Sequence, residues 1–199
     1  MINHEELINN INDSCKYLFP NQVFKLEEKI LSNSAKVYKI QGNSKAFNRK
    51  KNEIFEVSVL NWFEDFYLYI EVRFVSNHTF ISLSVFKGAD AQSNKHQLFR
   101  AEWDDYDRDD EIHAQPHWHI TTDVAISDNF NNFLGEKEQV TFEVFELSKA
   151  EVFDIKNFHF AMLGNWQQDE THIHKISEPA KVTKWLIGVL KHIRVELDV

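Results

Sequence analysis

The sequence predicts an α+β protein, in which an antiparallel meander sheet of about 5–6 strands packs against N- and C-terminal helices. Three observations predict this class. Apolar residues recur at helical spacing near both ends of the chain, and apolar and polar residues alternate in several segments between them. The length of 199 residues is that of one ordinary domain, so a single domain over 1–199 is expected.

The two helices are expected over residues 3–18 and from Ser177 to near the end of the chain. Pro20 should end the first helix, and Pro179 suits the first turn of the second. The apolar stripe of the first helix is Leu7, Ile8, Ile11, Cys15 and Leu18. The stripe of the second, which should pack against the sheet, is Val182, Trp185, Leu186, Val189, Leu190, Ile193 and Leu197.

Strands are expected over 53–60, 66–75, 79–86, 96–104 and 112–121, with 139–147 as a further candidate. Residues 22–50 give no clear pattern. They include most of a basic run between Ala35 and Lys51 that contains six cations and no acid. We interpret this run as a solvated linker, with an anion-binding arm as the alternative.

Composition excludes several classes of protein. The net charge of -9 is that of a poor nonspecific nucleic-acid binder, because affinity for phosphates comes mostly from Lys and Arg. A single cysteine, Cys15, excludes an intramolecular disulfide. The N-terminus does not read as a secretory signal, and no apolar run approaches the ~20 residues of a membrane span. A cytoplasmic protein without a membrane partner is therefore expected.

The segments 96–104 and 112–121 carry the residues that indicate a function. Because side chains alternate along a strand, Phe99, Ala101 and Trp103 mark the core face of the first segment. The polar residues of both segments should then share the opposite face: Arg100, Glu102, Asp104, His113, Gln115, His117 and His119.

A connecting loop centred near Arg108 fixes the expected register. It pairs Asp104 with His113, Glu102 with Gln115, and Arg100 with His117, although a slip by two residues would keep the same face. Four residues are candidates for substrate binding on this face: Tyr67, Tyr69, Arg73 and Gln115.

Three chemistries suit such a face. The first is metal-free acid–base catalysis, with His117 and His119 as acid and base and Arg100 stabilising a developing anion. Asp104 would orient His113, and Glu102 belongs to the same candidate catalytic set. The second is a zinc site at His113, His117 and His119. It is not favoured, because the charge of Arg100 facing His117 would repel a dication, so no cofactor is expected. The third is recognition without a reaction.

The run Arg100…Trp103-Asp104…His113…Pro116-His117-x-His119 resembles the His-rich signature of small bacterial toxin domains from toxin–antitoxin pairs. The resemblance covers the 20 residues from Arg100 to His119. It implies cleavage of RNA.

Two hypotheses follow from the sequence. The first is a small hydrolase of the toxin or defence kind, which cleaves RNA or a nucleotide phosphodiester by histidine acid–base chemistry. The alternative is a non-enzymatic component of a bacterial multi-protein system, which binds a protein partner. Whether the protein is an enzyme is left open by the sequence.

Overall fold

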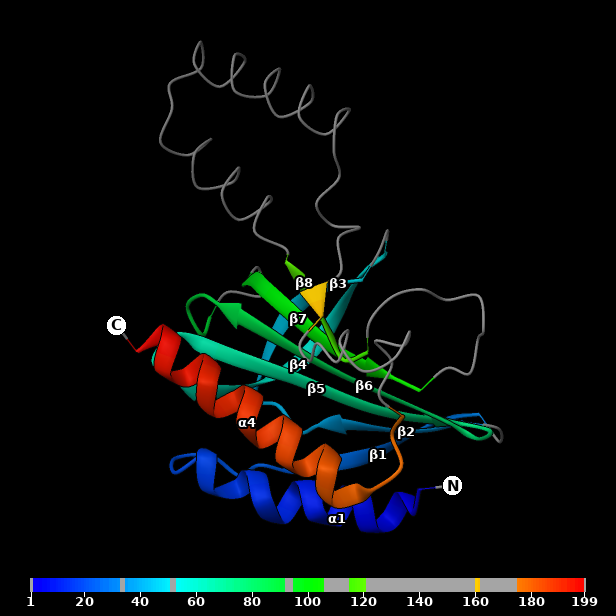
Figure 1. The fold of residues 1–199 in the computed structure, drawn as a ribbon. Coiled ribbons are helices and arrows are strands. Elements are labelled where there is room, and N and C mark those ends of the chain that lie inside the picture. Colours follow the sequence, from blue (N-terminus) through cyan, green and yellow to red (C-terminus); the bar gives the residue numbers. More distant parts are fainter. Residues whose placement is uncertain are drawn as a thin grey trace.

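The computed structural model describes residues 2–32, 35–50, 53–91, 95–105, 115–120, 160–161 and 175–198. Within these ranges nine strands form one antiparallel sheet, and helices α1 and α4 lie side by side along one of its faces (Figure 1). The α+β class and the helix near each end are confirmed. The expectation of about 5–6 strands was too low. Each strand from β3 to β9 pairs with the next described one in the chain, as in a meander, whereas β1 and β2 join the sheet through β5.

The strand order is β1-β2-β5-β6-β7-β8-β9, and β4 pairs with both β3 and β5. The strands are β1 (Leu26–Ser32), β2 (Ala35–Ile40), β3 (Ser44–Lys50), β4 (Glu53–Phe63), β5 (Phe66–Val75), β6 (His78–Lys87), β7 (His96–Asp104), β8 (His117–Ile120) and β9 (Phe160–Ala161). The expected strand over 112–121 is described only from Gln115 to Ile120, and the candidate strand over 139–147 lies outside the described residues.

Helix α1 (His4–Cys15) begins at an amide cap and ends before a proline. The Asn3 side chain accepts a hydrogen bond from the backbone N–H of Glu6, which satisfies one of the free donors of the first turn. A short 3-10 helix (Lys16–Leu18) follows, and Pro20 comes two residues later. The buried side chains of α1 are Leu7, Ile8, Ile11 and Cys15, four of the five expected from the sequence.

Helix α4 (Pro179–Leu197) has Glu178 as its N-cap residue and proline at its first position, so it begins two residues after Ser177, the expected start. The Trp185 ring meets Trp103 of β7 edge-on, with 5.2 Å between the ring centroids. No helix among the described residues combines the length and the hydropathy that crossing a membrane requires. The buried residues of α4 are Val182, Thr183, Leu186, Leu190 and Ile193, which confirms the face of the helix that packs on the sheet.

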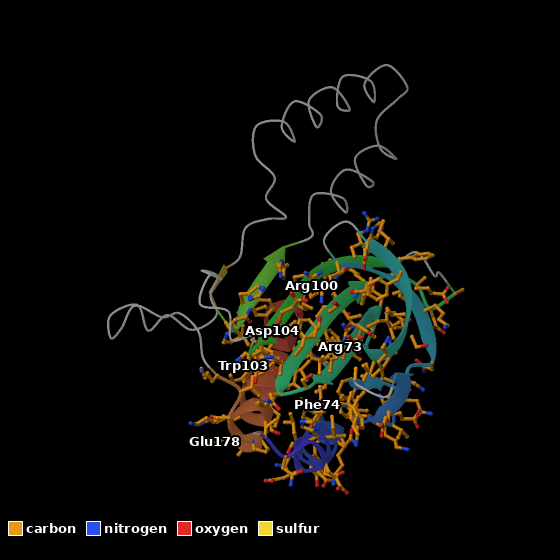
Figure 2. The ribbon with its side chains drawn as sticks, turned by 90° about the vertical axis from the view of Figure 1, so that its right-hand side faces the viewer. Arg73, Phe74, Arg100, Trp103, Asp104 and Glu178 are labelled. Atoms are coloured by element: carbon orange, nitrogen blue, oxygen red, sulfur yellow. The ribbon has the colours of Figure 1, made fainter. Side chains whose placement is uncertain are left out.

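The apolar side chains of β5 to β8 form the sheet face beneath these helices. One cross-strand row runs through Ile70, Leu83, Ala101 and Trp118. The first three are completely buried, and each large buried side chain of this kind stabilises the fold by about 1.5–3 kcal/mol. In Figure 2, Phe74 and Trp103 lie on the helix side of the sheet, whereas Arg100 lies on the other side.

The opposite, polar face is covered by the β3–β4 hairpin. Strand β4 pairs with β5 only over Leu60–Phe63, because β2 occupies the remainder of the same β5 edge. The first part of β4 pairs with β3 instead and leaves the plane of the sheet with it. The chain turns between β2 and β3 at Gly42, where an added Cβ would lie 2.4 Å from the carbonyl oxygen of Val59. This close approach of two backbones requires glycine.

The basic run is therefore not a solvated linker, and that interpretation was wrong. It contains all of β2 and β3; β2 pairs with β1 and β5, and β3 pairs with β4. The alternation along β3 is visible in its burial: Ser44, Ala46 and Asn48 are buried, whereas Lys45 is exposed. Lys50 has the parity of the inward set, which brings a cation to the polar face of the sheet.

Candidate functional site

The polar face of β7 and β8 carries the candidate site, in a register that differs from the expected one by two residues. Arg100 pairs with His119 and Glu102 pairs with His117, so the expected pairing of Arg100 with His117 was wrong. Gln115 then falls near Asp104, where its side-chain oxygen accepts a hydrogen bond from the Asp104 backbone N–H at 2.8 Å. A two-residue slip keeps every side chain on its face, so the shared face predicted for Arg100, Glu102, His117 and His119 is the one observed.

Two imidazoles and one carboxylate converge at this position. His119 Nε2 lies 2.8 Å from His117 Nε2 and 2.9 Å from Glu102 Oε2. The remaining separation, between His117 Nε2 and Glu102 Oε2, is 3.8 Å. All three residues are buried, so the cluster is shielded from bulk water.

Glu102 is ionised in spite of its burial. Burial by itself would raise the pKa of the carboxyl, since it disfavours the charged form. The hydrogen bond with His119 and the charges of Arg100 and Lys50 outweigh burial and hold the pKa of Glu102 well below its usual range. The site therefore contains a permanent anion at neutral pH.

Two cations hold the second oxygen of this carboxylate. Arg100 Nε lies 2.9 Å and Lys50 Nζ 3.6 Å from Glu102 Oε1. The Arg100 guanidinium also donates to the backbone carbonyl of Arg49 at 2.6 Å. The Lys50 side chain retains 31% of its exposure against 3% for Arg100, so Lys50 is the group of this cluster that reaches solvent.

Strand β3 closes the face through hydrogen bonds to side chains that stand on β6 and β7. The backbone N–H of Arg49 donates to Gln97 Oε1 at 2.7 Å, and Gln97 Nε2 donates to Ser84 Oγ at 3.2 Å. Ser84 Oγ in turn donates to Asn48 Oδ1 at 2.9 Å. The first of these contacts gives a partner to a backbone N–H of β3, and the other two join its Asn48 side chain to the sheet through Ser84.

A second buried carboxylate, Glu71, lies two strands away on the same face. It accepts hydrogen bonds from Tyr69 at 2.6 Å and from Arg73 at 2.5 Å, and Lys39 lies 3.4 Å away. Burial would raise the pKa of Glu71, but the Tyr69 hydrogen bond and the two cations outweigh it and lower that pKa. Tyr69 and Arg73, both candidates for substrate binding, are thus engaged with Glu71.

Tyr67, the remaining candidate for substrate binding on β5, lies near the start of that strand. Its hydroxyl donates to Asp90 at 3.3 Å, and the Lys95 ammonium lies 4.5 Å from its ring centroid. Lys95 is itself buried and donates to Ser44 Oγ and to two backbone carbonyls. These contacts fasten the segment before β7 to β3, at a distance from the histidines.

Phe80 lies near one cation of each carboxylate cluster. Its ring centroid is 4.0 Å from Lys50 Nζ and 6.0 Å from the Arg73 guanidinium. Each cluster has two cations around one carboxylate: Lys39 and Arg73 around Glu71, and Lys50 and Arg100 around Glu102.

The sequence-based prediction of the site divides into three parts. The structure brings His117, His119, Glu102 and Arg100 together. His113 lies outside the described residues, as do His172 and His174, a second His-x-His pair in the sequence. Lys50 was not among the predicted site residues. The alternation of Ser44, Ala46, Asn48 and Lys50 was the only available signal for its orientation.

Neither a family model, nor a curated protein, nor a solved structure matches this chain. The resemblance to toxin domains therefore gains no support from these comparisons. The function must be inferred from the geometry of the site itself.

Proposed function

We propose that this protein is a hydrolase for an anionic substrate, the phosphodiester of RNA or of a nucleotide. One observation carries the proposal: two imidazoles and an ionised carboxylate converge within hydrogen-bond distance, next to Arg100 and Lys50. Imidazoles transfer protons, or hold an ion that activates water, near neutral pH. Arginine and lysine stabilise the negative charge that develops on phosphoryl oxygens.

The distribution of charge supports an anionic substrate. The negative charge of the buried Glu102 is balanced by that of Arg100, so the positive charge of the partly exposed Lys50 is left over near the cluster. The Arg73 guanidinium lies 6.0 Å from the centroid of the Phe80 ring, which Lys50 also approaches. A phosphate arriving from solvent would meet these two cations before it reached the histidines, so they would serve in binding.

A second function, as a non-enzymatic component that binds a protein partner, is favoured by the burial of the cluster. A buried ionic network can serve to fix one arrangement of the strands without any reaction. The two functions differ in one measurable respect, because only the hydrolase requires the chemistry of the histidines and of Lys50.

The test is cleavage of RNA and of an activated phosphodiester by the purified full-length chain, by His117→Ala and by Lys50→Gln. We expect His117→Ala to lose activity, and Lys50→Gln to lower kcat/KM about tenfold, the effect of roughly 1.4 kcal/mol of lost charge stabilisation. Lys45→Gln is the matched control, since it removes the same charge from the exposed side of β3.

Thermal unfolding of each variant establishes that it is folded. Equal activity of Lys50→Gln and Lys45→Gln would contradict the proposed role of the cations. Catalytic silence of the wild type toward all of these substrates, free of any inhibitory partner, would leave the interaction component as the better reading.

A further inference from the structure

We propose that Glu102, His117 and His119 form a binding site for one divalent transition-metal ion of the zinc class. This inference deepens the proposed function by naming its cofactor, and it rests on that function only for the use made of the ion. Metal binding can be measured without any assay of activity, so each of the two can fail separately.

The spacing of the three ligand atoms fits such an ion. The three atoms are separated by 2.8, 2.9 and 3.8 Å, and these distances set the size of the circle that passes through all three. The radius of that circle is about 1.9 Å, slightly below the metal–nitrogen distance of ~2.0–2.1 Å for zinc. A point roughly 0.7 Å above the plane of the three atoms is therefore at bonding distance from all of them.

The contacts of His119 Nε2 point to a shared cation. A ring nitrogen has one in-plane position, which holds either a proton or a lone pair. With a proton, Nε2 can donate to Glu102 or to His117, but not fully to both. With a lone pair, it faces the negative carboxylate oxygen 2.9 Å away. A metal ion at the centre resolves this conflict, because it accepts the lone pairs of both imidazoles and of the carboxylate together.

The donor set indicates the class of ion. Two imidazoles and a carboxylate are ligands of zinc and of other first-row transition metals, whereas Mg²⁺ and Ca²⁺ take oxygen ligands. The three described ligands come from two paired strands, β7 and β8, which hold them on one face in a fixed register. Such a set leaves coordination positions for water or substrate.

The groups behind Glu102 orient it as a ligand. Arg100 Nε and Lys50 Nζ lie against Oε1, and Oε2 is the oxygen at the histidines, where it also accepts a longer hydrogen bond of 3.4 Å from Arg100 Nη2. Partners of this kind fix a ligating carboxylate and support metal affinity. The sequence-based argument against zinc placed Arg100 opposite His117. In the structure Arg100 faces His119 in the register, and its charge is paired with Glu102 and directed to the Arg49 carbonyl.

An ion at this position would supply an activated water at neutral pH, which is the chemistry that phosphodiester hydrolysis requires. The surrounding Arg100 and Lys50 would favour an anion as a further ligand. The chain's own contribution is thus to bind the ion by three side chains and to attract the substrate by two cations.

The experiment titrates chelator-treated full-length protein with Zn²⁺ and Co²⁺, with Mg²⁺ as the comparison ion. We expect one zinc per chain by calorimetry and elemental analysis, a rise in Tm on addition of zinc, and no such rise with Mg²⁺. His119→Gln and Glu102→Gln should lose this stoichiometric zinc. His192→Gln should retain it, because His192 is exposed on α4.

A substitution that gains a signal guards against variants that merely unfold. In His117→Cys, bound Co²⁺ should acquire a thiolate charge-transfer band that the wild type lacks, although the wild type contains the buried Cys15. Absence of zinc binding in the wild type, or unchanged zinc stoichiometry in His119→Gln, would overturn the proposal. Cleavage that survives complete chelation would support the hydrolase and reject the ion as its cofactor. Zinc binding without cleavage would support the metal site and reject the hydrolase.

Discussion

Glu102 on β7 lies at hydrogen-bond distance from His119, its diagonal neighbour on β8, and not from His117, the residue directly opposite. The Oε2–Nε2 distance is 2.9 Å to His119 and 3.8 Å to His117. Long side chains reach such diagonal neighbours across an antiparallel pair. Glu102 is consequently the common partner of His119 and of Arg100, two residues that face each other in the register.

This central position predicts that Glu102→Gln destabilises the fold. The substitution leaves the buried Arg100 charge uncompensated, and breaking a buried ion pair in this way costs about 3–5 kcal/mol. Urea denaturation in the presence of a chelator measures the free energy of unfolding. Glu56→Gln is the control, because its pair with Lys45 is half-exposed and should contribute less than about 1 kcal/mol. Equal losses of unfolding free energy in the two variants would contradict the stabilising role of Glu102 as the common partner of Arg100 and His119.

Alanine should have opposite effects on stability at Gly42, in the turn between β2 and β3, and at Gly188, on α4. Gly42→Ala would place Cβ 2.4 Å from the backbone oxygen of Val59, and overpacking of this kind costs about 1–3 kcal/mol or more. Gly188→Ala on α4 meets no atom within 4 Å and should stabilise the helix by up to about 1 kcal/mol. Thermal unfolding compares the two variants with the wild type. A neutral Gly42→Ala would mean that the turn before β3 does not approach the Val59 backbone of β4 as closely as described.

Glu71 predicts a loss of stability in acid. Its pKa is lowered in the folded state, so its contribution is present above the unfolded value of about 4.3 and disappears as the pH falls through the folded value. The free energy of unfolding of the wild type should therefore exceed that of Glu71→Gln at pH 7. The difference should shrink toward zero in strong acid. A gap that stays constant between pH 7 and the acid limit would show that the lost stability does not come from the ionised carboxylate.

Cys15 should be inert to thiol reagents while the protein is folded. Burial of the last residue of α1 in the core raises the pKa of the thiol to about 12, so the reactive thiolate is scarce at pH 8. Labelling with a chromogenic disulfide should proceed at the rate of unfolding and accelerate on addition of urea. A Cys15→Ala/Asp13→Cys double variant is the comparison, since residue 13 is exposed and its thiol should react at once. Rapid labelling of the native wild type would place Cys15 outside the core.

The site was predicted to the extent that it depends on local sequence. Alternation along 96–104 separated Arg100 and Glu102 from Ala101 and Trp103, and the structure confirms that division. The register was not predicted, because it depends on the connection between β7 and β8, and a slip of two residues changes no face. The choice between His117 and His119 as the partner of Arg100 followed from that register.

The sequence by itself determined the elements whose pattern repeats over several turns or strand residues: α1, α4, and the strands β5, β6 and β7. Only the tertiary structure decided that β3 folds over the polar face and that Lys50 reaches Glu102. Arg100 and Arg49, which are in hydrogen-bond contact, are 51 residues apart in the chain. Contacts over such separations depend on which strand pairs with which part of β5, here β2 and β4 along the same edge. This pairing depends on how whole sheet faces are buried, and a short stretch of sequence does not carry that information.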